Sequence, residues 1–384
     1  MSQMRHYPRG VVAIHRDGKK IGGGFVPLTV PSVSDTPLSV LDLAPIVAGS
    51  GPSEALARSV DLIRRAESLG FTRYWVAEHH NMPGIASSAP AVLIAHLAAV
   101  TSTIRVGSGG VMLPNHPPLV IAEQFGMLEA LHPGRIDLGI GRAPGTDPGT
   151  AAALRRTAAG ISAEDFPEQF VDLVSFFTGE WAEGHPYRAI TAVPARGNMP
   201  AVWLLGSSGY SAQVAGLLGL PFAFAHHFSA DNTLPAVELY RSRFRPSPAL
   251  ERPYVMLGVS VICAASDEEA AWQAGPQKLS FVRLRQGRPG LLPTPEEAAA
   301  HDYGPAEQAV LASRASGQIT GGPDTVRRGL QGLLDATGAD ELMVTTMVHD
   351  HRERLASYER LADLRAGGDG RVGEAAAVAA PVAR

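Results

Sequence analysis

Residues 104–141 read IRVGSGGVMLPNHPPLVIAEQFGMLEALHPGRIDLGIG, and this stretch predicts a strand, a helix and a second strand. The runs 104–113 and 135–141 are short and apolar, and residues 119–131 between them have the length and composition of a helix. Two short apolar strands separated by a helix are typical of parallel pairing through a right-handed crossover.

The same alternation extends along the chain in both directions. Strands are expected at 38–43, 73–78, 104–113, 135–141, 201–206, 221–226, 255–263 and 341–346. Helical patterns follow them at 53–69, 89–101, 119–131, 163–178, 208–218, 234–245, 267–277 and 351–364. Eight strand–helix units close most naturally into a barrel, so the sequence predicts an α/β fold of the (β/α)8 TIM-barrel type. A doubly wound open sheet is the alternative, although it normally uses fewer strands.

Some local signals refine this expectation. In the first helix, Ser53 is the expected N-cap residue and Gly70 the residue just beyond the C-terminal end. Two intervals are too long to be simple loops: 179–198 before the fifth strand and 279–322 before the eighth. We treat both as insertions and expect the second to be a mobile cover over the open end of the barrel.

The domain organisation follows from the ends of this pattern. The barrel is expected to form a single catalytic domain over residues 37–365. Residues 1–36 would precede it as a partly ordered extension. Residues 366–384 are rich in glycine and alanine and are expected to be a disordered tail.

Composition narrows the classes of partner and the cellular location. Of the 384 residues, 45% are hydrophobic and 18% are charged, which is enough for a large buried core. The net charge is −4 and no basic stripe stands out, so nucleic acid is not an expected partner. A lone cysteine, Cys263, cannot form an internal disulfide. Because there is no signal segment and no apolar run of ~18 residues, we expect a cytoplasmic protein that does not enter membranes.

Polar and glycine-rich residues follow six of the predicted strands at their C-terminal ends, where this fold builds its active sites. The candidate site residues at these ends are Asp42, Glu78, His79, Gly109, Gly110, Arg142, Ser207, Ser208, Gly209, Tyr210, Ser211 and His226. Because six strand ends contribute, the pattern indicates a site rather than chance.

The segment 207–211, SSGYS, directly precedes a predicted helix. Free backbone N–H groups at a helix N-terminus favour a phosphate, and Arg142 on the neighbouring strand end can add a charge-assisted contact. The alternative is that Ser207 or Ser208 merely caps the helix.

The sequence Glu78-His79-His80 follows the second strand. Successive strand residues face opposite sides, so only one of the two histidines is expected to point into the pocket, where it can exchange protons near neutral pH. A metal site built from these two histidines with His226 and His227 is the competing idea. Both pairs are adjacent rather than spaced, so no metal is expected.

Four motifs together carry a family likeness. They are GFTRYWVAEHHN (70–81), IRVGSGGVMLPNHPP (104–118), LHPGRIDLGIGRAPG (131–145) and LLGSSGYSAQVAGLLGLPFAFAHHF (204–228). In this order they resemble the bacterial luciferase-like flavin-dependent monooxygenases, in particular the branch called group one that occurs in some antibiotic pathways. The resemblance runs from about residue 38 to residue 364.

The resemblance implies an enzyme that uses reduced FMN, supplied by a separate flavin reductase, and molecular oxygen. It would form a flavin C4a-peroxide in a pocket that excludes water and oxygenate a small organic substrate, such as an aromatic polyketide of secondary metabolism. The family's dimer packs helices of the second and third units together. The apolar stretch 89–100 would contribute to it, so a homodimer is expected.

The resemblance also implies roles for individual residues. His79 matches the catalytic histidine, and Glu78 beside it would line the flavin site. Gly109-Gly110 matches a non-prolyl cis peptide under the flavin ring. Arg142 matches an arginine that contacts the phosphate, which Ser207, Ser208 and Ser211 would cradle. Bacterial luciferase has a reactive cysteine where this chain has Gly141, so light emission is not implied.

Two other functions remain open on the same barrel. A deazaflavin-dependent dehydrogenase or reductase would transfer hydride without oxygen. Its coenzyme has a longer anionic side chain, and no extra Lys/Arg cluster lies beside the phosphate segment to receive it. A non-catalytic flavin-binding protein would bind flavin tightly without oxygen-linked turnover.

Overall fold

The computed structural model describes residues 31–143, 146–155 and 165–367. The strands are β1 (Leu38–Asp42), β2 (Arg73–Val76), β3 (Arg105–Met112), β4 (Ile136–Gly141), β5 (Ala201–Gly206), β6 (Phe222–Phe224), β7 (Val255–Cys263), β8 (Gln318–Gly321) and β9 (Glu341–Thr345). The α-helices are α1 (Pro52–Ser68), α2 (Pro90–Ala99), α3 (Pro118–Leu131), α4 (Pro148–Arg155), α5 (Phe166–Thr178), α6 (Gly209–Leu218), α7 (Thr233–Arg243), α8 (Asp267–Gln273), α9 (Gly275–Arg285), α10 (Pro295–Ala299), α11 (Pro305–Ala312), α12 (Pro323–Thr337) and α13 (His351–Arg365). Single 3-10 turns are η1 (Leu113–Asn115), η4 (Ala230–Asn232) and η5 (Ala315–Gly317).

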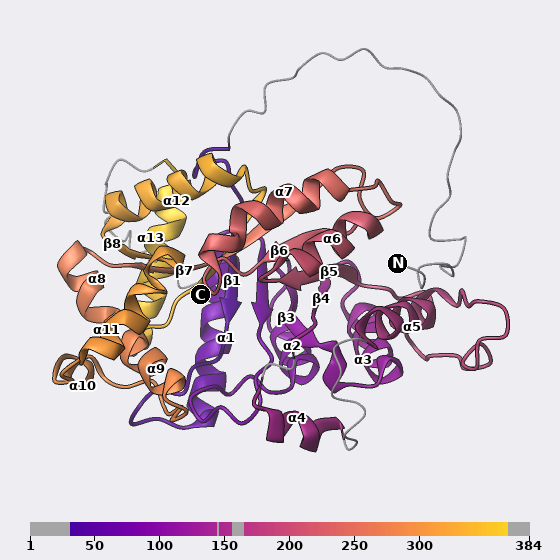
Figure 1. The fold of residues 1–384 in the computed structure, drawn as a ribbon, viewed down its shortest axis with the longest axis horizontal. Coiled ribbons are helices and arrows are strands. Elements are labelled where there is room, and N and C mark those ends of the chain that lie inside the picture. Colours follow the sequence, from indigo (N-terminus) through magenta and orange to yellow (C-terminus); the bar gives the residue numbers. More distant parts are fainter. Residues whose placement is uncertain (1–30, 144–145, 156–164, 368–384) are drawn as a thin grey trace, which may run out of the picture.

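Eight of the strands close into a barrel. The strands β1 to β7 pair in sequence order, β9 follows β7, and β9 pairs back with β1, all in parallel. Helices surround the strands (Figure 1). The predicted α/β barrel is therefore confirmed. Among the described helices, none is both long enough and apolar enough to span a bilayer.

The structure contains one strand beyond the eight predicted from the sequence, and this additional strand is β8. One edge of β7 pairs with β6 at Val255 to Leu257 and, further along, with β8 at Ser260 to Cys263. Since β6 is only three residues long, β8 occupies the edge of β7 beyond it. The four residues QITG of β8 carry no alternating or continuous apolar pattern, which is why the sequence gave no signal for this strand.

The start of α1 differs from the expectation. Ser53 does not cap α1, because the helix begins one residue earlier, at Pro52, with Gly51 as the N-cap residue. Proline is well suited to the first helical position, since its missing N–H would have no partner there. Gly70 does follow the C-terminal end with a φ of 75°, as expected. The helices α4, α10, α11 and α12 were not predicted, and α9 extends well beyond the predicted helix 267–277.

The two long intervals lie at different ends of the barrel. Residues 179–198 connect α5 to β5, so they lie at the N-terminal ends of the strands, and they project beside α5 (Figure 1). Residues 279–322 are folded and include α10, α11 and β8. Leu292 in this insertion bonds to the main chain of Ile46 and Ala48, in the loop that follows β1. The second insertion therefore rests on the open end of the barrel, which we call the mouth.

The ends of the chain are only partly within the described residues. Of the predicted extension, residues 1–30 lie outside them, whereas Val33 is buried and its N–H donates to Gln331 on α12 at 3.0 Å. Of the predicted tail, residues 368–384 lie outside the described residues.

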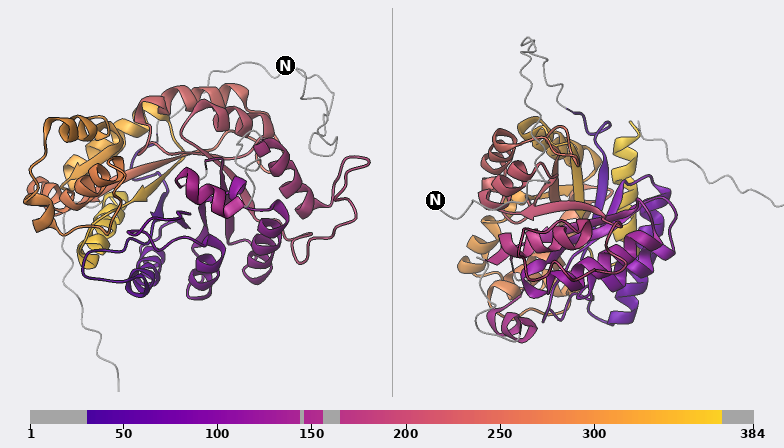
Figure 2. Two further views of the ribbon diagram at one scale, coloured as in Figure 1. Left: turned by 60° about the horizontal axis from the view of Figure 1, so that its bottom comes forward. Right: turned by 90° about the vertical axis from the view of Figure 1, so that its right-hand side faces the viewer.

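Two views from other directions show the ring of helices around the barrel (Figure 2).

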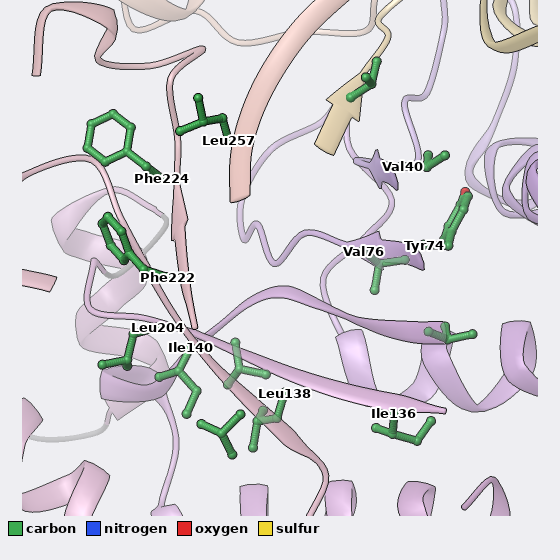
Figure 3. Close-up of a cluster of buried hydrophobic side chains, with 14 of the residues drawn as sticks. Val40, Tyr74, Val76, Ile136, Leu138, Ile140, Leu204, Phe222, Phe224 and Leu257 are labelled. Carbon is green, nitrogen blue, oxygen red and sulfur yellow. The ribbon is translucent and has the colours of Figure 1, made fainter. Parts of the chain in front are cut away.

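Alternate side chains of each strand face outward and form the main core. Figure 3 shows outward residues such as Val40, Tyr74 and Val76 together with Leu138 and Ile140. They pack with buried residues of the surrounding helices, for example Leu62 and Ile63 of α1, in one apolar cluster. Burial of this layer between sheet and helices is the main favourable contribution to the fold.

The inward side chains form two layers. At the N-terminal ends of the strands, the guanidinium of Arg73 lies 2.8 Å from Asp137 Oδ2 and 2.7 Å from Glu341 Oε1. Trp75 Nε1–H also donates to Asp137, at 2.9 Å. Above this ionic layer lies an apolar layer made of Leu41, Trp75, Ala77, Trp203, Ala223, Met256 and Met343. The barrel interior is therefore filled up to the mouth.

Replacing Arg73 tests the ionic layer. In Arg73→Ala, Asp137 and Glu341 would stay buried without their common cation, and we expect a loss of about 3–5 kcal/mol in the free energy of unfolding. Urea unfolding monitored by tryptophan fluorescence measures this loss. The exposed Arg64 on α1 gives the control Arg64→Ala, which should change stability by less than about 0.5 kcal/mol. A loss below about 1 kcal/mol in Arg73→Ala would contradict this role.

Candidate functional site

His79 points into the mouth of the barrel. Trp75 and Ala77 belong to the interior layer, and His79 is the next residue of the same alternation. Its N–H donates to the carbonyl of Ser87 at 3.0 Å, which fixes the main chain. Its Nδ1 is buried and has no hydrogen-bond partner. Buried polar atoms without a partner are rare, so this nitrogen marks His79 as a candidate ligand-binding residue.

The charge state of His79 follows from its surroundings. Burial lowers the pKa of His79 below 6.5, and the positive field of His80 lowers it further, while the negative charge of Glu78 acts in the opposite direction. At neutral pH the imidazole is therefore uncharged, and it can accept or donate a proton.

Glu78 and His80 point away from the interior, as the alternation requires. Glu78 Oε1 lies 2.9 Å from His80 Nε2 and 2.8 Å from His116 Nε2, and Oε2 accepts the N–H of Met112 at 3.1 Å. Burial favours a higher pKa for Glu78, but the hydrogen bonds from His116, His80 and Met112 together lower it to about 2. Both oxygens are engaged, so Glu78 positions the loop that carries His79 and ties it to the end of β3.

The same three side chains are the one group of histidines and acids within the described ranges whose ligand atoms could converge on a metal ion. The ligand atoms of Glu78, His80 and His116 all lie within 4.8 Å of one another. The four histidines considered from the sequence form no such group. The short contacts of the imidazole nitrogens to Glu78 Oε1 are those of hydrogen bonds, which already account for this cluster.

Gly109 and Gly110 lie on the inner side of β3, below the mouth. The peptide bond between them is cis, in agreement with the family resemblance. A Cβ on Gly109 would lie 2.7 Å from Leu41 Cδ1, and one on Gly110 would lie 2.7 Å from the carbonyl oxygen of Gly139. Neither position has room for a side chain, so the floor of the mouth at β3 is bare backbone.

Arg142 and the N-terminus of α6 form a second part of the mouth. Arg142 directly follows β4, and its guanidinium lies 4.3 Å from the ring centre of Tyr210, in the first turn of α6. Ser208 is the N-cap residue, yet its hydroxyl accepts no hydrogen bond from the helix. Ser208 thus occupies the capping position that the alternative gave it, but its hydroxyl remains unused by the helix. Ser207 and Ser208 are exposed, whereas Ser211 is buried.

This second part has the chemistry of an anion site. Over the described residues, the guanidinium of Arg142 is bound to no carboxylate, and the first N–H groups of α6 point away from the helix at the positive end of its dipole. Gly209 at the first helical position adds no side chain that would cover these groups. A phosphate would satisfy both the guanidinium and the helix N-terminus.

Asp42 lies outside the barrel interior. Its carboxylate accepts bonds from the hydroxyls of Ser59 and Tyr74, from Arg354 Nη2 at 2.7 Å and from the N–H of Ala44 at 2.8 Å. It is fully buried. Burial acts to raise the pKa of Asp42, but Arg354 and the two hydroxyls lower it overall. Asp42 therefore joins β1 to α1 and α13 and does not line the mouth, contrary to the expectation from the sequence.

The sequence predicted His226 as a site residue, but the structure brings His227 to the interior side instead. His226 Nδ1 lies 2.8 Å from the hydroxyl of Thr233, so this ring is anchored to the start of α7. His227 follows the alternation that places Ala223 in the interior, and its Nδ1–H donates to the carbonyl of Gly258 at 2.9 Å. A Cβ on Gly258 would meet the His227 ring at 3.0 Å. His227 was missed as a site residue, although counting inward positions from Ala223 would have found it.

A buried hydroxyl was also missed. Thr345, two residues beyond the interior residue Met343 on β9, has a buried Oγ1 with no hydrogen-bond partner. Like His79 Nδ1, it is a buried polar atom without a partner, and it lies at an inward-facing position near the C-terminal end of its strand. Counting alternate residues along β9 would again have identified it.

Comparisons with known proteins identify the family of this chain. The family model described as luciferase-like monooxygenase matches residues 36–341. A protein of Escherichia coli (strain K12) named luciferase-like monooxygenase is 50% identical over 85% of this chain and 96% of its own length. The chain belongs to the luciferase-like monooxygenase family.

Two further relatives place the chain within this family. The N-acetyl-S-alkylcysteine monooxygenase of Bacillus subtilis (strain 168) is 33% identical over 85% of this chain and 97% of its own length. The crystal structure of apo-MsnO8 is 42% identical, covers 86% of this chain and 98% of its own, and superposes with a TM-score of 0.79.

Proposed function

We propose that this protein is a monooxygenase that binds reduced FMN, supplied by a separate flavin reductase, and uses molecular oxygen to oxygenate a small organic substrate. One observation carries the proposal. His79, whose buried Nδ1 has no hydrogen-bond partner, lies at the same end of the barrel as the Arg142–Tyr210 pair and the uncovered N-terminus of α6. An anchor for a phosphate and a free neutral imidazole are what such a flavin would require.

The residues fit this cofactor in three ways. Arg142, Ser207, Ser208 and the first N–H groups of α6 would hold the phosphate. The bare backbone at Gly109-Gly110 would let a flat ring approach closely. The apolar layer below, with Trp75 and Trp203, would keep water from the reacting atoms. Reduced FMN would supply the electrons that activate molecular oxygen.

The role of His79 would be proton transfer. Its uncharged imidazole can hold or transfer a proton at Nδ1, beside the reacting oxygen atoms. Glu78 would act through position, because its bonds to His80 and His116 fix the loop.

The fold itself admits more than one cofactor. The oxygenating constituent of 3,6-diketocamphane monooxygenase, a type II Baeyer–Villiger enzyme solved in complex with FMN, is 20% identical with a TM-score of 0.65. An F420-dependent secondary alcohol dehydrogenase is 11% identical with a TM-score of 0.60. Since identities this low establish the fold alone, cofactor choice must be measured directly.

The deciding experiment is anaerobic binding followed by exposure to oxygen. The protein is titrated with reduced FMN, reduced riboflavin and the reduced F420 deazaflavin, and each complex is then mixed with oxygen. We expect reduced FMN to bind tightest and its complex to be oxidised by oxygen. Preferential binding of the deazaflavin would contradict the proposal and favour hydride transfer. Tight binding of flavin with no oxygen-linked product from any substrate would favour a storage protein.

The phosphate anchor is tested by Arg142→Ala. Loss of a charge-assisted contact of about 1.5–3 kcal/mol should weaken binding of reduced FMN by roughly 10- to 100-fold, yet leave binding of riboflavin, which has no phosphate, nearly unchanged. Anaerobic fluorescence titration measures both affinities. Arg188→Ala, an exposed arginine in the insertion 179–198, is the control. Equal losses for both flavins would show that Arg142 does not bind the phosphate.

The role of His79 is tested by His79→Ala. We expect reduced FMN to bind with an affinity within about threefold of the wild type, and product formation to fall by about 10²–10⁴-fold. The readout is ¹⁸O from ¹⁸O2 in N-acetyl-S-benzyl-L-cysteine, a trial substrate chosen from the named relative. His132→Ala, at the C-terminal end of α3 and hence the far end of the barrel, is the control. Wild-type product formation in His79→Ala would remove His79 from the reaction.

A homodimer through α2 and α3 completes the proposal. These neighbouring helices expose apolar side chains: Val92 is 72% exposed, Met127 52% and Leu131 63%. The double variant Val92→Lys/Leu131→Lys should be a monomer by light scattering at concentrations where the wild type is a dimer. The matched control is Val193→Lys, which is 68% exposed on the insertion 179–198. A dimeric double variant would place the interface elsewhere.

A further inference from the structure

A cavity of about 290 Å³ lies beside the mouth, between the loop after β6 and the second insertion. It exists because β6 ends after three residues and the chain from Ser313 to Gly317 packs against the loop that follows it. A Cβ on Gly317 would lie 3.0 Å from the carbonyl oxygen of His226. The lining of the cavity includes His226, His227, Asp231, Phe281, Arg285 and Arg314.

Arg314 is a largely buried cation in this cavity without an acidic partner. Its guanidinium lies 4.4 Å from the ring centre of Phe281, and its Nε is buried without a hydrogen bond. No carboxylate of the described residues lies within 4.0 Å of it. Burial lowers the pKa of Arg314 to about 10, so it remains charged at neutral pH. A buried charge without a counter-ion is costly, which makes an anionic ligand the natural partner.

The other charges around the cavity support an anion. Arg285 of α9 contributes a second guanidinium to the wall. Asp231, an acidic residue of the lining, is exposed and forms no ion pair with either arginine. Both histidines have pKa values lowered chiefly by burial, that of His227 to about 4, so neither is charged at neutral pH. The arginines therefore set the charge of the cavity.

His227 lies between this cavity and the mouth. Its buried ring packs over the inner side of Gly258 on β7, and it also lines the cavity. A ligand held at Arg314 would therefore contact His227, and the rest of the ligand would have to pass this ring to reach the interior side of β7. Phe281 gives the cavity an aromatic wall, which suits an organic chain better than a small inorganic ion.

We propose that this cavity binds the carboxylate of an organic acid, whose remaining part reaches the barrel mouth and is oxygenated there. A single monoanion would neutralise the one largely buried cation, and the planar guanidinium of Arg314 matches a carboxylate in geometry. This substrate class rests on the proposed function, but the anion site itself does not.

The test therefore begins without flavin. The melting temperature of the apo protein is measured with acetate, benzoate, 4-phenylbutanoate and N-acetyl-S-benzyl-L-cysteine, each against its neutral carboxamide at equal ionic strength, and with inorganic phosphate. We expect at least one of the aromatic acids to raise the melting temperature by several degrees at millimolar concentration, and its amide to have no such effect. If no acid exceeds its amide, or phosphate is the best ligand, the proposal is overturned.

Two variants connect the effect to Arg314. Arg314→Met should abolish the stabilisation by the acid and should not lower the melting temperature of the apo protein, because it removes a buried charge that lacks a counter-ion. Arg288→Met, on the same insertion but exposed, should behave as the wild type. A large loss of apo stability in Arg314→Met, with the acid effect retained, would show that Arg314 is structural.

The substrate role is a separate measurement on the FMN-loaded enzyme. Arg314→Met should keep the affinity for reduced FMN and raise the KM for the acid at least tenfold, with a smaller change in kcat. If the acid binds near Arg314 but no oxygen is transferred, the anion site stands and the proposed function fails. If oxygen is transferred with the same KM in Arg314→Met, the function stands and the carboxylate site fails.

Discussion

The geometry of the mouth depends on the buried guanidinium of Arg73. It joins Asp137 of β4 and Glu341 of β9, and so links three strands of the barrel through its interior. Trp75 and Arg105 also bond to Asp137, which makes that carboxylate common to neighbouring strands. Because Arg73, Asp137 and Glu341 are buried, none of them can turn outward without losing its partner, and the inward face of their strands is fixed.

The alternation of inward and outward side chains that begins at this ionic layer determines which residues of β2 reach the mouth. From Arg73, every second residue of β2 and its extension faces inward, which gives Trp75, Ala77 and then His79. Glu78 and His80 face outward instead, and Glu78 Oε1 lies within hydrogen-bond distance of both His80 and His116. One shift of register would exchange the imidazole for a carboxylate at the reacting position. The ionic layer thus determines that His79, and not Glu78, faces the mouth.

The mouth divides into a part built on strand ends and a part that belongs to the second insertion. The candidate anion site at Arg142 and α6 and the imidazole of His79 lie at the ends of β2, β4 and β5. The cavity at Arg314 arises between β6 and the insertion that includes α11 and β8. Loops vary more freely than the barrel that carries them, so the insertion is the natural place to set substrate preference.

The sequence by itself determined the barrel, because eight alternations of apolar runs and helices admit few other closures. It also predicted the segment 207–211 before α6 and the pair Gly109-Gly110, since both are local patterns. Only the tertiary structure decided that Asp42 bonds to Arg354, 312 positions away, and that His227 rather than His226 reaches the interior side. It also supplied β8, whose four residues pair only because β6 leaves an edge of β7 open. Closure of the barrel brings residues that are distant in the chain into contact, and the local periodicity of the sequence cannot predict such contacts.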